Sequence, residues 1–217
     1  NLPKSDIFFY ASNGHGVWEA ASSNLGSDHH TLLIAGSGHF SDQWAIQTEG
    51  LGLSVLRTPH TEGQRINVDA IESALRSDST HKIAAVMVVH TDTASGITSD
   101  LLAIRQAIDR AQHPAIYVVD VVASLAATSF DMDALGVDVC LGSSQKGLMM
   151  PPGLGFVAVN DKAFDWSHQH AKHRFYWSWF ERKSTVQSAK FCGTPPLAHL
   201  AGLETSLRLL QDEGLHA

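Results

Sequence analysis

The sequence has few cysteines, no basic cluster and no long apolar run, and each absence argues against a class of protein. Two cysteines among 217 residues, Cys140 and Cys192, cannot build the disulfide framework of a small secreted domain. No apolar stretch approaches the roughly 20 residues of a membrane-spanning helix, and no secretory signal is recognisable at the start. The formal net charge is −7, with no basic run longer than Arg182-Lys183. We therefore expect a cytoplasmic protein whose partners are neither nucleic acids nor membranes.

What remains is the composition of a globular enzyme-sized domain. Hydrophobic residues make up 44% of the chain and charged residues 17%, which fits a packed core and argues against disorder. Residue 1 is Asn rather than Met, a strand pattern begins within a few residues, and the last helical pattern continues almost to Ala217. We expect residues 1–217 to form one large domain that is part of a longer polypeptide.

Strand-like and helix-like stretches alternate along most of the chain. Alternation of this kind is typical of βα units and predicts an α/β fold with a mainly parallel sheet. The continuous apolar run 83–89 indicates a strand covered on both faces. Asn67, and Ser99 or Asp100, are expected helix caps. The predicted strands are 7–10, 31–35, 52–56, 83–89, 115–119, 137–141 and 156–159, and the predicted helices are 14–25, 40–51, 68–75, 100–111 and 197–210.

Polar residues follow several of these strands. Parallel sheets bind ligands beyond the carboxyl ends of their strands. The segment 13–15 follows the first strand, 90–96 follows the long apolar strand, Asp120 ends another, and Lys146 follows the next. Because these segments are independent of one another, their shared position predicts a site at one edge of the sheet.

The pair Lys146 and Asp120 suits the chemistry of pyridoxal phosphate. Lys146 lies among small hydroxyl and apolar residues, which argues against a simple surface lysine, and its amine could form a Schiff base with the cofactor aldehyde. A buried carboxylate at Asp120 would pair with the pyridinium nitrogen and keep it protonated. The alternative for Asp120 is a strand-end cap of the following turn. Gly14-His15-Gly16, between a strand and a helix, could bind a phosphate, although a glycine turn before a helix is common.

Two other site types are less consistent with the sequence. The spacing His168-x-His170-x-x-His173 resembles a metal site, but no Cys, Asp or Glu completes it and aromatic residues surround it. We therefore expect no metal, and interpret 168–181 as a loop or interface segment in a region, 165–190, where the strand–helix alternation is lost. A Ser-His-Asp hydrolase is not supported, because no Gly-x-Ser-x-Gly elbow is present.

Four segments, in order, resemble one family. They are Asn13-Gly14-His15-Gly16-Val17-Trp18-Glu19-Ala20-Ala21, the loop 90–96, Val119-Asp120-Val121-Val122-Ala123-Ser124, and the segment 142–153 around Lys146. Together with Thr194-Pro195-Pro196 and the helix that follows, they are similar to the class V aminotransferases of fold type I, and most similar to the serine–glyoxylate branch. The resemblance covers essentially the whole chain. It implies a three-layer α/β/α large domain that binds pyridoxal 5'-phosphate.

The resemblance also implies a role for each matching residue. Lys146 would hold the cofactor aldehyde, Asp120 would pair with the ring nitrogen, Phe40 would stack on the ring, and Thr93 would bond near the ring hydroxyl. The cofactor phosphate would be lined by Asn13, Gly14, His15 and Gln145, and Thr194 would reach the phosphate of the partner subunit's site in a homodimer.

The function implied is transfer of an amino group from serine or alanine to glyoxylate or a similar 2-oxo acid. The small C-terminal domain that supplies an arginine for the substrate carboxylate, and the N-terminal segment over the site, have no counterpart in residues 1–217. Two alternatives stay open: a lyase or desulfurase relative that uses the same cofactor, and a catalytically inactive dimerising binding module with the same fold.

Overall fold

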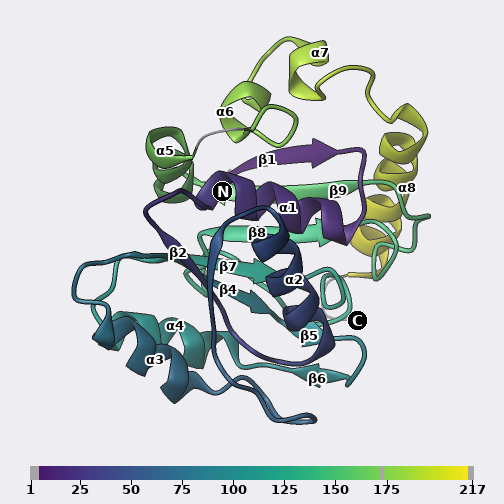
Figure 1. The fold of residues 1–217 in the computed structure, drawn as a ribbon. Coiled ribbons are helices and arrows are strands. Elements are labelled where there is room, and N and C mark those ends of the chain that lie inside the picture. Colours follow the sequence, from purple (N-terminus) through teal and green to yellow (C-terminus); the bar gives the residue numbers. More distant parts are fainter. Residues whose placement is uncertain (1–4, 172–173, 215–217) are drawn as a thin grey trace.

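A computed structural model describes residues 5–171 and 174–214 and contains a central sheet of seven strands (Figure 1). The strands lie in the order β1-β9-β8-β7-β4-β2-β3. Their bounds are β1 Ser5–Tyr10, β2 Thr31–Ile34, β3 Ser54–Arg57, β4 Ile83–Val89, β7 Ile116–Asp120, β8 Val139–Ser143 and β9 Gly155–Asn160. A separate hairpin pairs β5 (Thr91–Asp92) with β6 (Ile97–Thr98).

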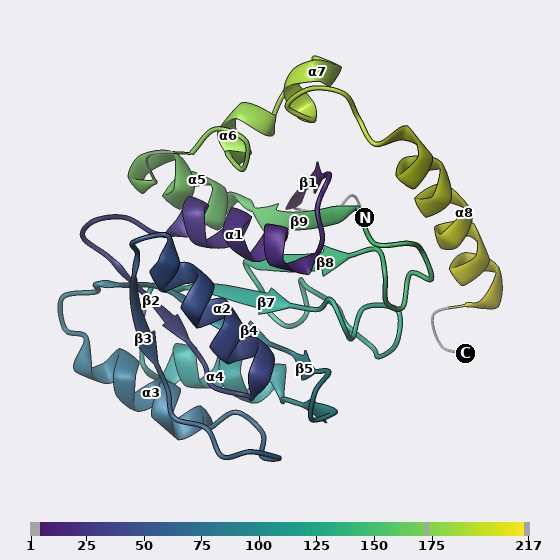
Figure 2. The ribbon, with the colours of Figure 1, turned by 45° about the vertical axis from the view of Figure 1, so that its right-hand side comes forward.

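Helices cover both faces of this sheet, which gives the three-layer α/β/α fold that the sequence predicts (Figures 1 and 2). One hydrophobic core lies under α1, α2 and α5, and a second core lies under α3 and α4. The helices are α1 Gly14–Leu25, α2 His39–Gly50, α3 Val68–Ser77, α4 Leu101–Arg110, α5 Asp161–His170, α6 Trp179–Arg182, α7 Gln187–Lys190 and α8 Leu197–Glu213.

Strand directions decide where the carboxyl ends meet. The strands β3, β2, β4, β7 and β8 are parallel, and β9 runs antiparallel to both β8 and β1. Consequently β1 runs in the direction of the parallel strands although it lies at the edge of the sheet. All seven residues of β4 are buried, as expected for a strand covered on both faces.

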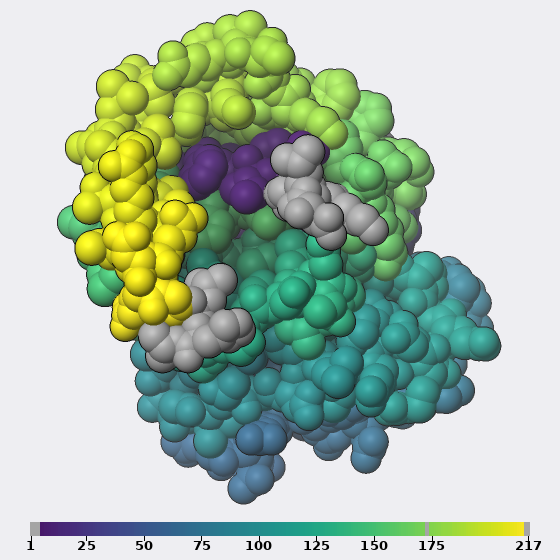
Figure 3. All heavy atoms as spheres, turned by 180° about the vertical axis from the view of Figure 1, so that it is seen from behind, coloured from purple at the N-terminus to yellow at the C-terminus, as the bar shows by residue number. Residues whose placement is uncertain are grey.

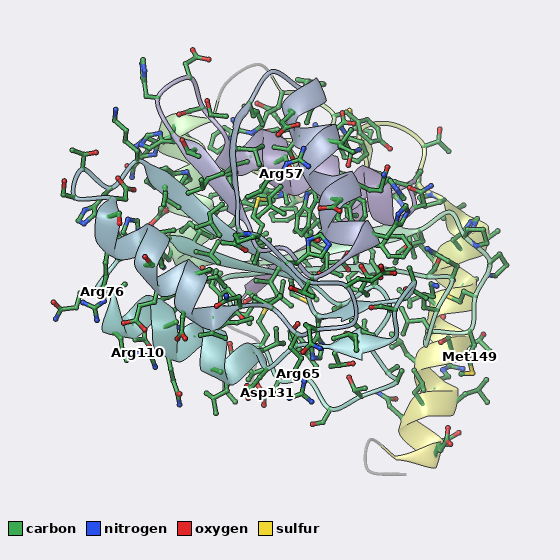
Figure 4. The ribbon with its side chains drawn as sticks, turned by 60° about the horizontal axis from the view of Figure 1, so that its bottom comes forward. Arg57, Arg65, Arg76, Arg110, Asp131 and Met149 are labelled. Carbon is green, nitrogen blue, oxygen red and sulfur yellow. The ribbon has the colours of Figure 1, made fainter. Side chains whose placement is uncertain are left out.

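Helix starts follow the capping signals in the sequence. The side chain of Asn67 accepts a hydrogen bond from the Ala70 N–H, and Asp100, rather than Ser99, caps α4. On the outer face, Glu72 of α3 pairs with Arg76 and with Arg110 of α4, which lie beside each other in Figure 4. These exposed pairs tie the ends of the two helices together, although each contributes little on its own.

In the region 165–190, the prediction of a loop or interface segment is partly wrong. Helix α5 continues to His170, and the short helices α6 and α7 follow, where a loop was expected. Helix α5 is only ten residues long and buries only Ala163 and Ser167, so few positions in the sequence mark a buried face. The hairpin of β5 and β6 was also missed, since strands of two residues carry no readable alternation.

The face opposite α1 and α2 carries α8. Figure 3 shows the yellow α8 and the segment of α6 and α7 bordering a hollow, with purple residues of β1 at its floor. Leu203 of α8 packs with Leu148, Met150 and Leu154, so this helix buries the apolar side of the loop that follows β8. None of the helices in the described parts of the chain has the length and apolarity to span a bilayer.

The buried Asp138 joins three elements at the amino end of the sheet, and it provides a test of the fold. Its carboxylate accepts hydrogen bonds from the Tyr117 N–H at 2.8 Å, from Asn160 Nδ2 at 2.8 Å and from Lys162 Nζ at 2.9 Å. We predict that Asp138→Ala lowers the free energy of unfolding by about 3 kcal/mol or more, because buried donors lose their acceptor.

Urea unfolding of this variant beside Asp133→Ala checks the prediction. Asp133 lies five residues earlier, is exposed, and its side chain has no hydrogen bond to another described residue. This control should change the free energy of unfolding by less than about 0.5 kcal/mol. Equal losses in both variants would contradict the role given to Asp138.

Candidate active site

The carboxyl ends of four strands meet at one edge of the sheet. Register places Asp120 of β7 between Val89 of β4 and Leu141 of β8, and Ser143 of β8 opposite Gly155 of β9. Gly155 in turn pairs with Tyr10 at the end of β1. The loops that begin at residues 11, 90, 121 and 144 therefore start from neighbouring strands, as the sequence predicts.

Asp120 is the buried acid at this edge. The residue is 4% exposed, and its two carboxylate oxygens accept hydrogen bonds from different elements. Trp18 Nε1 of α1 donates to Oδ2 at 2.6 Å, and the Val122 N–H donates to Oδ1 at 2.6 Å. The interpretation of Asp120 as a cap of the turn after β7 is therefore partly correct. Its Oδ1 accepts from that turn, whereas its Oδ2 accepts from helix α1.

Burial has the largest effect on the pKa of the Asp120 carboxyl. Removal from water raises the pKa of its carboxyl from 3.8 to about 6, while the hydrogen bonds from Val122 and Trp18 oppose this rise. Burial also lowers the pKa of the neighbouring His90, whose Nδ1 lies 2.8 Å from Ser124 Oγ. The edge thus holds an acid that titrates near neutral pH beside an imidazole that favours its neutral form.

Helix α1 begins at the same edge. Asn13 Oδ1 accepts from the Gly16 N–H at 3.3 Å and caps the helix, and the Asn13 carbonyl accepts the first intrahelical bond, from Val17. The N–H groups of Gly14 and His15 have no intrahelical acceptor, as in the first turn of any helix. Gly14 is buried against Val122, where a Cβ would be 3.4 Å from a methyl carbon, whereas Asn13 and His15 are exposed.

Asp92 connects the loops after β2 and β4. Its carboxylate is fully buried and accepts from the Phe40 N–H at 3.0 Å and from the Ala94 N–H at 2.9 Å. Gly38 has a φ of 143°, and a Cβ there would lie 2.7 Å from Asp92 Oδ2, so the approach requires glycine. The half-buried Phe40 ring lies 6.2 Å from the Trp18 ring, while Thr93 is exposed on the turn after β5.

The loop carrying Lys146 is tied down from within. Ser144 Oγ donates to the Pro151 carbonyl at 2.7 Å and accepts from the Leu154 N–H at 3.3 Å, while the Ser143 hydroxyl donates to Gln145 Oε1. Leu148 turns toward α8, and Ser206 of that helix donates to the Leu148 carbonyl. The loop is therefore braced by internal hydrogen bonds and by α8.

Lys146 itself is exposed, which corrects the expectation that its neighbours keep it away from the surface. The apolar residues Leu148 and Met150 of the same loop pack against α8. Met149, 62% exposed, also points outward beside α8 (Figure 4). The Lys146 side chain is therefore accessible to solvent.

The remaining residues divide between this edge and the surface. Gln145 is half-buried beside Lys146, whereas Thr194 is exposed in the connection between α7 and α8 and belongs to no strand end. The structure therefore brings the loops of Asn13, Phe40, Asp120 and Lys146 to one sheet edge, and leaves Thr194 on a separate segment.

Two residues at this edge had no role assigned from sequence. Trp18 lies in the motif 13–21 and Asp92 in the segment 90–96, and the sequence assigns neither a role of its own. A signal was available for Trp18, since a buried indole N–H needs an acceptor. No local signal identifies its partner, which lies 102 residues further along the chain.

His168 and His170 take part in aromatic packing. The His168 ring stacks on Phe180 at 4.4 Å, and the His170 ring stacks on Trp166 at 3.9 Å and meets His30 edge-on. His173 lies outside the described residues. Within 5–171 and 174–214, no group of three or more His, Cys, Asp or Glu side chains has the arrangement of a metal site.

This chain is similar to known proteins in both sequence and fold. The serine–glyoxylate aminotransferase of Methylorubrum extorquens is 40% identical over 214 residues, which cover 96% of this chain and 53% of that protein. The L-aspartate–glyoxylate aminotransferase of Paracoccus denitrificans is 35% identical, with 98% and 54% covered. A Thermus thermophilus aspartate aminotransferase structure superposes with a TM-score of 0.83 at 26% identity, covering 98% of this chain and 58% of that one.

This chain spans about half the length of the curated relatives that it matches. A sequence model of the family described as "Aminotransferase class-V" matches residues 1–217, from the first residue of the chain to the last. Since that match extends through every loop at the carboxyl edge of the sheet, the chain belongs to the class-V aminotransferase family.

Proposed function

We propose that this chain is the large domain of a pyridoxal-phosphate-dependent aminotransferase that moves an amino group from serine or alanine to glyoxylate or a similar 2-oxo acid. The observation that carries the proposal is the buried Asp120, held by two donors at a sheet edge where the lysine loop of the neighbouring strand also begins. The relatives named as serine–glyoxylate aminotransferases, up to 40% identical, support this choice of substrates.

The residues at the edge suit both ends of such a cofactor. Bound pyridoxal phosphate supplies an electron-withdrawing ring that stabilises negative charge at the carbon next to the amino group. Asp120 keeps the ring nitrogen protonated, because an anion beside it favours the cationic form. A positively charged ring nitrogen bound there would in turn lower the pKa of Asp120, so that each group would hold the other in its charged state. Lys146 binds the aldehyde and afterwards carries a proton as a general acid and base.

The phosphate is assigned to the start of α1. First-turn N–H groups and the helix dipole favour an anion there, and Gly14 lets the backbone approach closely. Ser12 Oγ is buried and has no hydrogen-bond partner among the described residues, which leaves one hydroxyl unused next to Asn13. His15 and Gln145 complete the proposed phosphate ligands from this chain.

Three further residues have roles in this proposal. Phe40 stacks on the ring, and the Asp92 carboxylate fixes its backbone together with the turn that carries Thr93. Thr194, exposed on the segment before α8, reaches the phosphate of the second subunit in a homodimer with shared sites. A cytoplasmic location is proposed because both cysteines are free thiols.

The lyase or desulfurase alternative has weaker support. Such an enzyme needs a reactive thiol, and burial raises the pKa of Cys140, which is 5% exposed within β8. Cys192 is half-exposed, but it lies between α7 and α8 rather than after a strand at the carboxyl edge. Release of sulfide from cysteine would favour this alternative, and cofactor binding without any turnover would favour the inactive dimerising module.

Lys146→Ala tests the proposed attachment point. We expect the wild-type protein to gain a visible absorbance band with added pyridoxal phosphate, and the variant to show only the spectrum of the free cofactor, because no other amine occupies that loop. Lys82→Ala is the matched control: Lys82 is also exposed but lies before β4, at the opposite end of the sheet. A wild-type protein without the band would overturn the proposed function, and a band retained in Lys146→Ala would overturn the assignment of the lysine.

Asp120→Asn tests the buried acid without added cofactor. Because burial raises the folded-state pKa of Asp120 from 3.8 to about 6, the contribution of this group to stability is fully present below about pH 4, and about 3 kcal/mol of it is lost as pH rises through 6. Asn does not titrate, so the difference in unfolding free energy between variant and wild type should shift by that amount between about pH 4 and pH 8 in favour of the variant. Urea unfolding of both proteins measures this difference, and parallel pH profiles would contradict the assignment.

With cofactor, the Asp120→Asn variant should lose most of its transamination.

A further inference from the structure

One hydrogen bond joins a helix to the proposed catalytic carboxylate. Trp18 Nε1 in α1 lies 2.6 Å from Asp120 Oδ2 at the end of β7, and the two residues are 2% and 4% exposed. A hydrogen bond to an ionised acceptor is shorter and about twice as strong as one between neutral groups. The short distance and the burial of both partners make this the side-chain contact best placed to act on Asp120.

The indole of Trp18 has little freedom to turn away. Its ring stacks on that of Trp44 at 5.6 Å with an interplanar angle of 13°, and the His15 ring lies 4.5 Å away on a tilted plane. Trp44 is fully buried, and its own Nε1 donates to Ser22 Oγ at 3.3 Å. The direction of the Trp18 N–H is therefore set by packing within α1 and α2 rather than by Asp120.

The second oxygen of Asp120 is fixed independently by the Val122 N–H. Two donors from two elements determine the plane of the carboxylate. A carboxylate offers about four lone-pair positions, so two remain for a further partner. Removing the Trp18 bond would leave the plane free to rotate about the remaining bond to Val122.

We propose that Trp18 is a positioning residue for Asp120: its indole N–H fixes the plane of the carboxylate and holds it ionised for the ring nitrogen of the cofactor. The inference rests on the proposed function for the identity of that partner. The effect of Trp18 on Asp120 is independent of the proposed function, because the hydrogen bond between them is present in the protein without cofactor. Trp18 acts through the carboxylate, and no contact with substrate is required of it.

The other groups around Asp120 do not replace this donor. His15 of α1 contacts the Trp18 ring, and His90 donates its backbone N–H to the Asp120 carbonyl while its ring meets Ser124. Cys140 of β8 has a pKa raised by burial and, to a lesser degree, by Asp120, so it stays a neutral thiol. Among the described side chains, Trp18 alone donates to the Asp120 carboxylate.

The experiment compares Trp18→Phe with Trp44→Phe in the intact protein without cofactor. Both variants remove one buried indole from the same stack, but only the first removes the donor to Asp120. The Asp120 titration is followed by carboxyl ¹³C NMR of aspartate-labelled protein, with Asp120→Asn to assign the signal. Trp18→Phe should raise the pKa of Asp120 from about 6 to about 7 or above, a roughly tenfold rise in proton affinity, and Trp44→Phe should leave it unchanged.

If Trp18→Phe does not fold, replacement of Trp18 by 3-benzothienylalanine is used to remove the donor instead. In this residue a sulfur atom replaces the N–H in a ring of nearly the same shape. An unchanged pKa in the Trp18 variants, or an equal rise in Trp44→Phe, would overturn the proposal. Uptake of pyridoxal phosphate by the wild type is measured in parallel. If the wild type takes up none while the pKa still rises, the proposed function fails and the coupling of Trp18 to Asp120 stands.

Discussion

A carboxylate held inside an apolar sheet edge constrains everything around it. Asp120 lies between β4 and β8, whose residues are buried throughout, and an ionised group there loses the hydration that it has in the unfolded chain. Two donors compensate part of that loss, and the carboxyl still titrates near pH 6. A buried carboxyl with a raised pKa marks a candidate functional group, and a positively charged partner such as the proposed ring nitrogen would offset the cost of its burial.

The loops around this acid are positioned by contacts between them, and the sheet only sets where they begin. The Asp92 carboxylate accepts hydrogen bonds from the backbone N–H groups of Phe40 and Ala94. It therefore links the start of α2 to the turn after β5. Ser144 closes the lysine loop on itself, and α8 packs against the apolar side of that loop. Helix α8 therefore contacts the loop that carries Lys146 through Ser206, which donates to the Leu148 carbonyl, and through Leu203.

Local signals explain what the sequence could predict. The start of α3 follows from the Asn67 cap and the bounds of β4 from an uninterrupted apolar run, and strand–helix alternation is enough to bring Asp120 and the lysine loop to one edge. The bond from Trp18 to Asp120 and the one from Asp92 to Phe40 join segments 102 and 52 residues apart, and no periodicity encodes such pairs. Helix α5 was missed although its signals are local, because it is ten residues long and buries only Ala163 and Ser167.

The segment that was hardest to interpret from sequence also has a structural task at the edge. Asn24, fully buried near the end of α1, donates to the Trp177 carbonyl at 2.7 Å and accepts from Arg174 Nε at 2.7 Å. Tyr10, at the end of β1, donates to the same Trp177 carbonyl. Residues 174–179 thus hold both the strand that precedes the proposed phosphate loop and the helix that follows it. A buried polar network of this kind is satisfied only in one arrangement, so α1 cannot slide along the sheet without breaking several bonds at once. The aromatic segment therefore fixes the position of the first-turn N–H groups from the far end of the helix.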